Sequence, residues 1–97
     1  MEEKLRFLPA KDFDRITIEG KEITVDVHML KRPQMERLVK NISALLKDEE
    51  FSLIINHGYN NGTVLKKDIR KDKFVFRPHT VVTNKYNLGI TTYVFAA

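Results

Sequence analysis

The fold is decided by residues 23–56, which read ITVDVHMLKRPQMERLVKNISALLKDEEFSLIIN. Residues 23–27 alternate apolar and polar side chains, which predicts a strand. Residues 51–56 are almost continuously apolar, which is typical of a central strand buried on both faces. Between them, apolar residues recur at three- and four-residue spacing after Pro33, which favours a helix over 33–47. A strand, a helix and a strand in this order predict a parallel pair joined by a right-handed crossover.

The flanking sequence completes this unit. A second helix is expected from Thr63, which is suited to cap it. Residues 74–76 and 80–83 then predict a strand interrupted at Pro78, and 89–95 predict a last strand paired with it around a turn at 84–87. We therefore expect an α/β fold of order β-α-β-α-β-β: a two-layer α/β sandwich with a mixed sheet covered by both helices.

The residues before this unit are more mixed. We treat 1–21 as an N-terminal extension and 22–97 as the domain proper. Residues 15–19 alternate and are followed by Gly20 and Lys21, which favours a short hairpin leading into the domain.

The composition limits the kinds of protein that this chain can be. With 97 residues, 42% of them apolar and 31% charged, the chain is sized for one soluble globular domain. It has no cysteine, which excludes a disulfide framework and a thiolate metal site. The charged N-terminus lacks the apolar core of a signal peptide, and no apolar run reaches membrane-spanning length. We expect a cytoplasmic protein without a membrane partner, and the oligomeric state stays open.

Positive charge is concentrated in one segment. Residues 63–85 carry a net charge of +5, whereas the rest of the chain carries −1. Its basic residues are Lys66, Lys67, Arg70, Lys71, Lys73, Arg77 and Lys85. Such a concentration favours contact with phosphates, and the alternative is a helix face that only meets water.

Polar residues gather where the two parallel strands should end. Asp26 and His28 are two apart, so they point to the same side, and His57 follows the second strand. The loop from Gly58 to Gly62 precedes a helix start, where backbone N–H groups favour anions. This spacing predicts a phosphate-binding mouth holding one carboxylate and two imidazoles. The structural alternatives are histidines that only donate hydrogen bonds and glycines that only turn the chain. A zinc site is not indicated, because the ligands are too few.

Three short motifs resemble one family. Residues 25–30, Val-Asp-Val-His-Met-Leu, resemble the Leu-Asp-Leu-His-Gly-Leu signature of the Smr (small MutS-related) domain. Residues 54–58 followed by 61–66 are similar to the family's His-Gly-x-Gly-x-Gly-x-Leu-Arg/Lys segment. Residues 87–95 resemble its closing strand, so the resemblance covers about 22–95. It implies a fold like the C-terminal domain of translation initiation factor three, and an activity that nicks DNA or cleaves RNA.

The resemblance also implies a site and shows departures from it. Carried over, the Asp-x-His element and the His-Gly loop become Asp26, His28, His57 and Gly58, with Lys66 as the basic residue. Met29 stands where the family has glycine, and 60–61 replace part of the glycine pattern in a loop one residue longer.

The functional reading is an endonuclease acting by acid/base phosphodiester cleavage. His57 or His28 would be the acid or base, and Asp26 would orient a histidine or hold a divalent cation, Mg²⁺ or Mn²⁺. No cofactor other than this cation is expected. The expected nucleic-acid contacts are Gly58, Tyr59, Asn60, Asn61, Gly62, Lys66, Lys67, Arg70, Lys71 and Arg77.

Two alternatives remain open. One is a non-catalytic nucleic-acid- or ribosome-binding module that uses the basic segment, with Tyr59 or Tyr86 stacking on unpaired bases. The other is a protein-interaction domain that dimerises through the hairpin edge or through residues 74–76.

Overall fold

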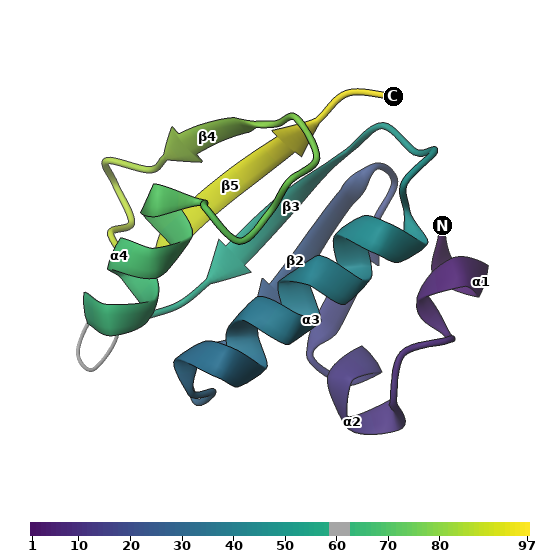
Figure 1. Ribbon diagram of the computed structural model, residues 1–97, viewed down its shortest axis with the longest axis horizontal. Coiled ribbons are helices and arrows are strands. Elements are labelled where there is room, and N and C mark those ends of the chain that lie inside the picture. The colour runs from purple at the N-terminus through teal and green to yellow at the C-terminus, as the bar shows by residue number, and fades with distance from the viewer. Residues whose placement is uncertain (59–62) are drawn as a thin grey trace.

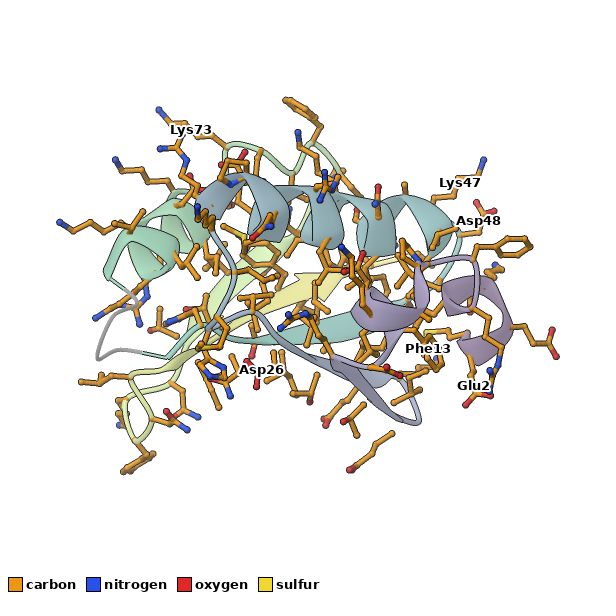
Figure 2. The ribbon with its side chains drawn as sticks, turned by 90° about the horizontal axis from the view of Figure 1, so that it is seen from below. Glu2, Phe13, Asp26, Lys47, Asp48 and Lys73 are labelled. Atoms are coloured by element: carbon orange, nitrogen blue, oxygen red, sulfur yellow. The ribbon has the colours of Figure 1, made fainter. Side chains whose placement is uncertain are left out.

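The computed structural model describes residues 1–58 and 63–97. Its strands form one five-stranded sheet in the order β1-β2-β3-β5-β4. The elements are α1 (Glu2–Leu5), α2 (Ala10–Phe13), β1 (Ile16–Glu19), β2 (Glu22–Asp26), α3 (Arg32–Leu45), β3 (Phe51–Asn56), α4 (Thr63–Lys71), β4 (Thr80–Thr83) and β5 (Ile90–Phe95). Helices lie on one side of the sheet, so that the molecule has two layers (Figures 1 and 2). The predicted two-layer α/β sandwich with a mixed sheet is confirmed.

The predicted strand–helix–strand unit forms the centre of the molecule. β2 and β3 pair in parallel, with Asp26 opposite Asn56 at their carboxyl ends, and α3 connects the two strands. β4 and β5 pair antiparallel as the expected hairpin, and β5 pairs antiparallel with β3. The carboxyl ends of β2, β3 and β4 and the start of β5 therefore share one end of the sheet (Figure 1).

The hydrophobic core lies between the sheet and the helices. Alternate residues of the central strands point into it, and α3 adds residues at helical spacing. Its fully buried members include Ile23, Val25, Leu53, Ile55 and Tyr93 from the sheet and Met35, Val39 and Ile42 from α3. Each buried aliphatic side chain contributes about 1.5–3 kcal/mol to folding. The core therefore holds the sheet in place, including the end that carries the polar residues.

The residues before β2 join the same core. Leu5 and Leu8 are buried in the cluster, and β1 pairs antiparallel with β2. Gly20, at φ +59°, supplies the turn of the hairpin that the alternating residues predicted. Segments 1–21 and 22–97 therefore pack as one body. The short helices α1 and α2 were not predicted, because four residues give no measurable periodicity.

Two expectations about the strands are wrong. β3 is central, but it is buried on one face only: Phe51, Leu53 and Ile55 are buried, whereas Ser52 and Ile54 are partly exposed. The reason is that the helices cover the same face of the sheet, which leaves the other face open.

The expected strand at residues 74–76 is a turn and an irregular segment. Asp72 adopts φ 51° just after α4, and Val75 N donates to Asp72 O at 3.3 Å. These local bonds occupy backbone groups that a strand would offer to a neighbour. Phe74 and Val75 pack into the core, while Phe76 is exposed.

The two chain ends lie toward the same end of the molecule (Figure 1). That end is opposite the carboxyl ends of β2 and β3 (Figure 1). No helix within residues 1–58 and 63–97 has both the length and the apolar character needed to cross a membrane.

Candidate functional site

Asp26 and His28 form an exposed pair at the carboxyl end of β2. The Asp26 Oδ1 atom accepts hydrogen bonds from the His28 backbone N–H, at 3.1 Å, and from its ring Nδ1. A carboxylate only accepts, so Nδ1 carries a hydrogen, and in the neutral form of the ring Nε2 holds the lone pair. Both side chains are about half exposed, at 43% and 48%. Asp26 thus orients an accessible imidazole and sets its tautomer.

The charge of Asp26 is maintained by its neighbours. Burial pushes its pKa upward, but hydrogen bonds from the His28 ring and backbone and the charge of Arg15 outweigh this and lower the pKa. Arg15 also donates from Nη1 to the Asp26 carbonyl oxygen at 3.5 Å. Asp26 is therefore ionised at neutral pH, as a residue that orients a histidine must be.

Two glycines bring three chain segments together beside this pair. Gly58 has φ +68°, and a Cβ atom there would lie 3.3 Å from the His28 Cβ. A Cβ on Gly89 would lie 3.2 Å from the Gly58 Cα. The N–H groups of His57 and Gly58 both donate to the Gly89 carbonyl oxygen, at 2.9 and 3.1 Å. The ends of β2 and β3 and the start of β5 are therefore packed backbone against backbone beside the Asp26–His28 pair, which we call the dyad.

His57 lies beneath this surface. Its side chain is fully buried; Nδ1 donates to the Gly58 carbonyl oxygen at 2.7 Å, and Nε2 accepts from Thr91 Oγ1 at 2.9 Å. Arg70 Nε in turn donates to Thr91 Oγ1 at 3.4 Å. Burial lowers the pKa of His57, and the charges of Arg70 and Lys66 add to this effect. The ring is neutral with both nitrogens occupied, so in this conformation it supports the Gly58 turn and does not face a ligand.

The basic residues of α4 divide between two sides of the helix. Lys66 and Arg70, one turn apart, lie close enough to His57 for their charges to act on it. Lys67 and Lys71 are exposed. Figure 2 shows Lys73 on the helix side of the molecule and Asp26 on the opposite, sheet side. Of the predicted basic contacts, the structure therefore brings Lys66 and Arg70 toward the end of the sheet that carries the dyad.

Arg77 is at the other end of the sheet. Its guanidinium donates to the carbonyl oxygens of Leu46, Glu49 and Ala96 at 2.8, 2.5 and 2.8 Å. It also stacks on the rings of Phe51 and Phe95, at 5.5 and 4.9 Å from their centroids. The six residues of β3 separate this position from the dyad by about 17 Å. Arg77 thus holds chain segments together, and the structure does not group it with the other predicted contacts.

Part of the predicted site is outside the described residues. This holds for Tyr59, Asn60, Asn61 and Gly62, and for the side chain of Thr63, the expected helix cap. The expected nucleic-acid contacts of residues 59–62 and the capping role of Thr63 stay predictions.

The described side chains do not form a metal cage. In residues 1–58 and 63–97 there is no group of three or more histidine, aspartate or glutamate residues placed to share an ion. The dyad offers one carboxylate and one ring nitrogen, fewer protein ligands than a dedicated zinc or calcium site uses. The dyad is therefore not a dedicated zinc or calcium site.

No protein-family model, curated protein or solved structure matches this chain. The resemblance to the Smr family therefore rests on the three sequence motifs.

Sequence reasoning missed two residues that build the site. Thr91 is fully buried and links His57 to Arg70, while Gly89 supports the Gly58 turn. One signal was available for Thr91: alternation along 89–95 places it on the same face as Tyr93 and Phe95. A hydroxyl on an apolar face needs a partner, and a neighbouring histidine is a suitable one.

Proposed function

We propose that this chain is a divergent Smr-type endonuclease domain that cleaves RNA with the Asp26–His28 dyad. The observation that carries the proposal is the dyad itself: an exposed imidazole whose Nδ1 is held by an ionised carboxylate, at the carboxyl ends of two parallel strands. Sites of α/β folds occupy this edge, and a carboxylate-oriented imidazole is a common acid/base group.

RNA is the favoured substrate because it carries its own nucleophile. Nε2 of His28 takes the proton from a 2′-hydroxyl, whose oxygen bonds to the adjacent phosphorus while the bond from phosphorus to the 5′-oxygen breaks. Water protonates the leaving 5′-oxygen, and His28 returns its proton to water. The products are a 2′,3′-cyclic phosphate and a 5′-hydroxyl. DNA has no 2′-hydroxyl and therefore cannot react by this route.

The neighbouring residues supply charge and geometry. Lys66 and Arg70 project from α4 near the same end of the sheet and attract the phosphate backbone. Gly58 permits close approach, since a side chain there would press on His28. His57 and Thr91 hold this turn from below and act as positioning residues.

The test is a cleavage assay on an end-labelled RNA and a DNA of the same sequence, resolved on denaturing gels. We expect the wild-type chain to shorten the RNA and leave the DNA intact, with a cyclic phosphate on the new 3′ end. His28→Ala and Asp26→Asn should abolish cleavage and retain binding. Asp48→Asn is the matched control, because Figure 2 places Asp48 at the opposite end of the molecule. Equal nicking of the DNA would contradict the role of the 2′-hydroxyl.

A binding module without chemistry is the second candidate, and Met29 favours it. This side chain is 75% exposed directly beside His28, at the position where the family has glycine. If the wild-type chain binds RNA in a salt-dependent manner and leaves every strand intact, binding is the function. Met29→Gly then tests whether the methionine side chain blocks the dyad.

A further inference from the structure

The turn between β4 and β5 is held in one shape by its own side chains. Asn84 Oδ1 accepts from the backbone N–H groups of Tyr86 and Asn87, at 2.9 and 3.1 Å. Asn87 Oδ1 accepts from Gly89 N at 3.0 Å, and the Asn87 carbonyl oxygen accepts from Ile90 N at 3.3 Å. Asparagines that bond the backbone in this way define Asx turns. Residues 84–89 therefore present their outer side chains from a fixed backbone.

This turn packs against the loop that contacts the dyad. Gly89 packs on Gly58, and Gly58 packs on His28. Tyr86 precedes Gly89 by three residues, so their Cα atoms are within about 11 Å of each other. Figure 2 shows the connection from β4 to β5 at the same end of the molecule as the labelled Asp26.

Tyr86 is almost fully exposed on this turn. Its exposed fraction is 90%, and the Lys85 ammonium lies 5.6 Å from the ring centroid. Leu88 and Met29 add exposed apolar surface, at 52% and 75%. The ring is not part of the core, and an apolar ring beside a cation suits a ligand with an aromatic face and a negative charge.

We propose that residues 84–88 form a stacking platform on which Tyr86 holds one unpaired base, with Lys85 attracting the attached phosphate. The platform makes single strands the ligand of this protein. A base within a duplex is stacked on both sides and has no free face, whereas an unpaired base can turn out onto an aromatic ring. The proposal rests on the proposed function, since the strand that Tyr86 holds is the one whose backbone reaches His28.

The test measures fluorescence anisotropy of a labelled single-stranded RNA and of the same strand in a duplex, with the full chain at low salt. Cleavage is prevented by using the His28→Ala background. We expect tighter binding of the single strand, and Tyr86→Ala should weaken that binding about 5- to 150-fold. Tyr86→Phe should keep the affinity, because the ring is retained. Phe76→Ala is the matched control, because Phe76 is a similarly exposed aromatic residue, at 88%. It lies beside α3 and not on the β4–β5 turn.

A second measurement separates stacking from a change in the fold. A single abasic nucleotide is moved stepwise through the RNA, and one position should weaken binding to the parent protein. The same position should have no effect on the Tyr86→Ala protein, because the partner ring is already absent. Thermal melting should show equal stability for the two proteins.

The outcomes distinguish the two proposals. Single-strand binding that is unchanged in Tyr86→Ala, or a preference for the duplex, overturns the stacking platform and leaves the proposed function standing. No binding of either RNA by the parent protein at low salt overturns the proposed function, and the platform with it.

Discussion

The ring of His57 and the hydroxyl of Thr91 meet inside the molecule, with Nε2 and Oγ1 2.9 Å apart. The hydrogen bond joins the loop after β3 to the second residue of β5. Because Nε2 accepts this bond, the hydrogen of the neutral ring is on Nδ1, which donates it to the Gly58 carbonyl oxygen. The contact with Thr91 therefore helps to orient the turn beside the dyad. The buried hydroxyl accepts from Arg70 as well, which ties α4 to the same point.

Thr91→Val should destabilise the protein by about 1–3 kcal/mol, because it keeps the shape but leaves the buried His57 nitrogen without a donor. Thr91→Ser should recover most of this loss. Urea unfolding followed by circular dichroism measures both. Thr92→Val is the control, since Thr92 lies one residue along on the open face. A Thr91→Val protein as stable as the Thr92→Val protein would mean that the contact contributes nothing.

The stability of the protein should depend on His57 in acid. The pKa of His57 is lowered by burial, so below pH about 6.5 the unfolded chain takes up a proton that the folded chain resists. This contribution to stability is present above pH 6.5 and is lost as the pH falls toward and through the pKa of the folded state. His57→Gln should remove that part of the slope. Unfolding free energies at pH 7.5, 6.5 and 5.5 give the comparison, and parallel curves for the two proteins would refute the assignment.

The protonation of Asp68 should change the stability of the protein with pH in the opposite direction. Arg32 Nε lies 3.2 Å from a Glu36 carboxylate oxygen and 3.6 Å from an Asp68 oxygen, between α3 and α4. Burial and the nearby Glu36 carboxylate raise the pKa of Asp68 from 3.8 to about 6, while the proximity of Asp68 lowers the pKa of Glu36. The stabilising proton is therefore fully present below pH about 4 and is lost as the pH rises through about 6.

The variant that tests this pair is Asp68→Asn, which keeps a donor for Glu36 at every pH. It should be more stable than the wild type by about 1–2 kcal/mol at pH 7.5 and should match it near pH 4. Asp48→Asn, at an exposed position, should show no such crossover. A lower stability of Asp68→Asn at pH 7.5 would mean that the ion pair with Arg32 outweighs the carboxyl pair.

Arg77 should matter for folding and not for nucleic-acid affinity. Arg77→Ala removes charged hydrogen bonds to three carbonyl oxygens and should cost about 2–4 kcal/mol. Arg77→Lys should recover little, because an ammonium cannot reproduce the planar fork. Where the variant remains folded, its affinity for RNA should equal that of the wild type, whereas Lys66→Ala should bind more weakly and with a smaller salt dependence. Equal losses of affinity would place Arg77 on the binding surface.

Gly58→Ala should disturb the dyad, and Gly20→Ala provides a matched comparison. Both glycines have positive φ, so alanine costs about 1–2 kcal/mol at either position. A Cβ on Gly20 meets nothing within 4 Å, whereas one on Gly58 presses on His28 at 3.3 Å. Only the Gly58 variant should therefore lose cleavage activity in the folded state. Equal activities would show that the dyad does not depend on this contact.

The sequence predicted the order of the elements because its signals are local. Alternation marked β2, helical spacing marked α3, and Asp26 and His28 fell on one side of the chain end as expected. It did not show that β3 is open on one face, because an apolar run has the same appearance whether one or two layers cover it. The sequence also did not reveal where Arg77 lies or that His57 is buried. Their surroundings come from segments 18–34 residues away along the chain, which only the folded arrangement brings into contact.

Both chain ends lie opposite the dyad (Figure 1). The protein can therefore be immobilised or joined to another protein through either terminus while the edge that carries His28 stays open to solvent. A surface-tethered sample held by its last residue, close to the carbonyl that Arg77 binds, would present every molecule in the same orientation. Long or structured RNA probes would then reach His28 as freely as short ones.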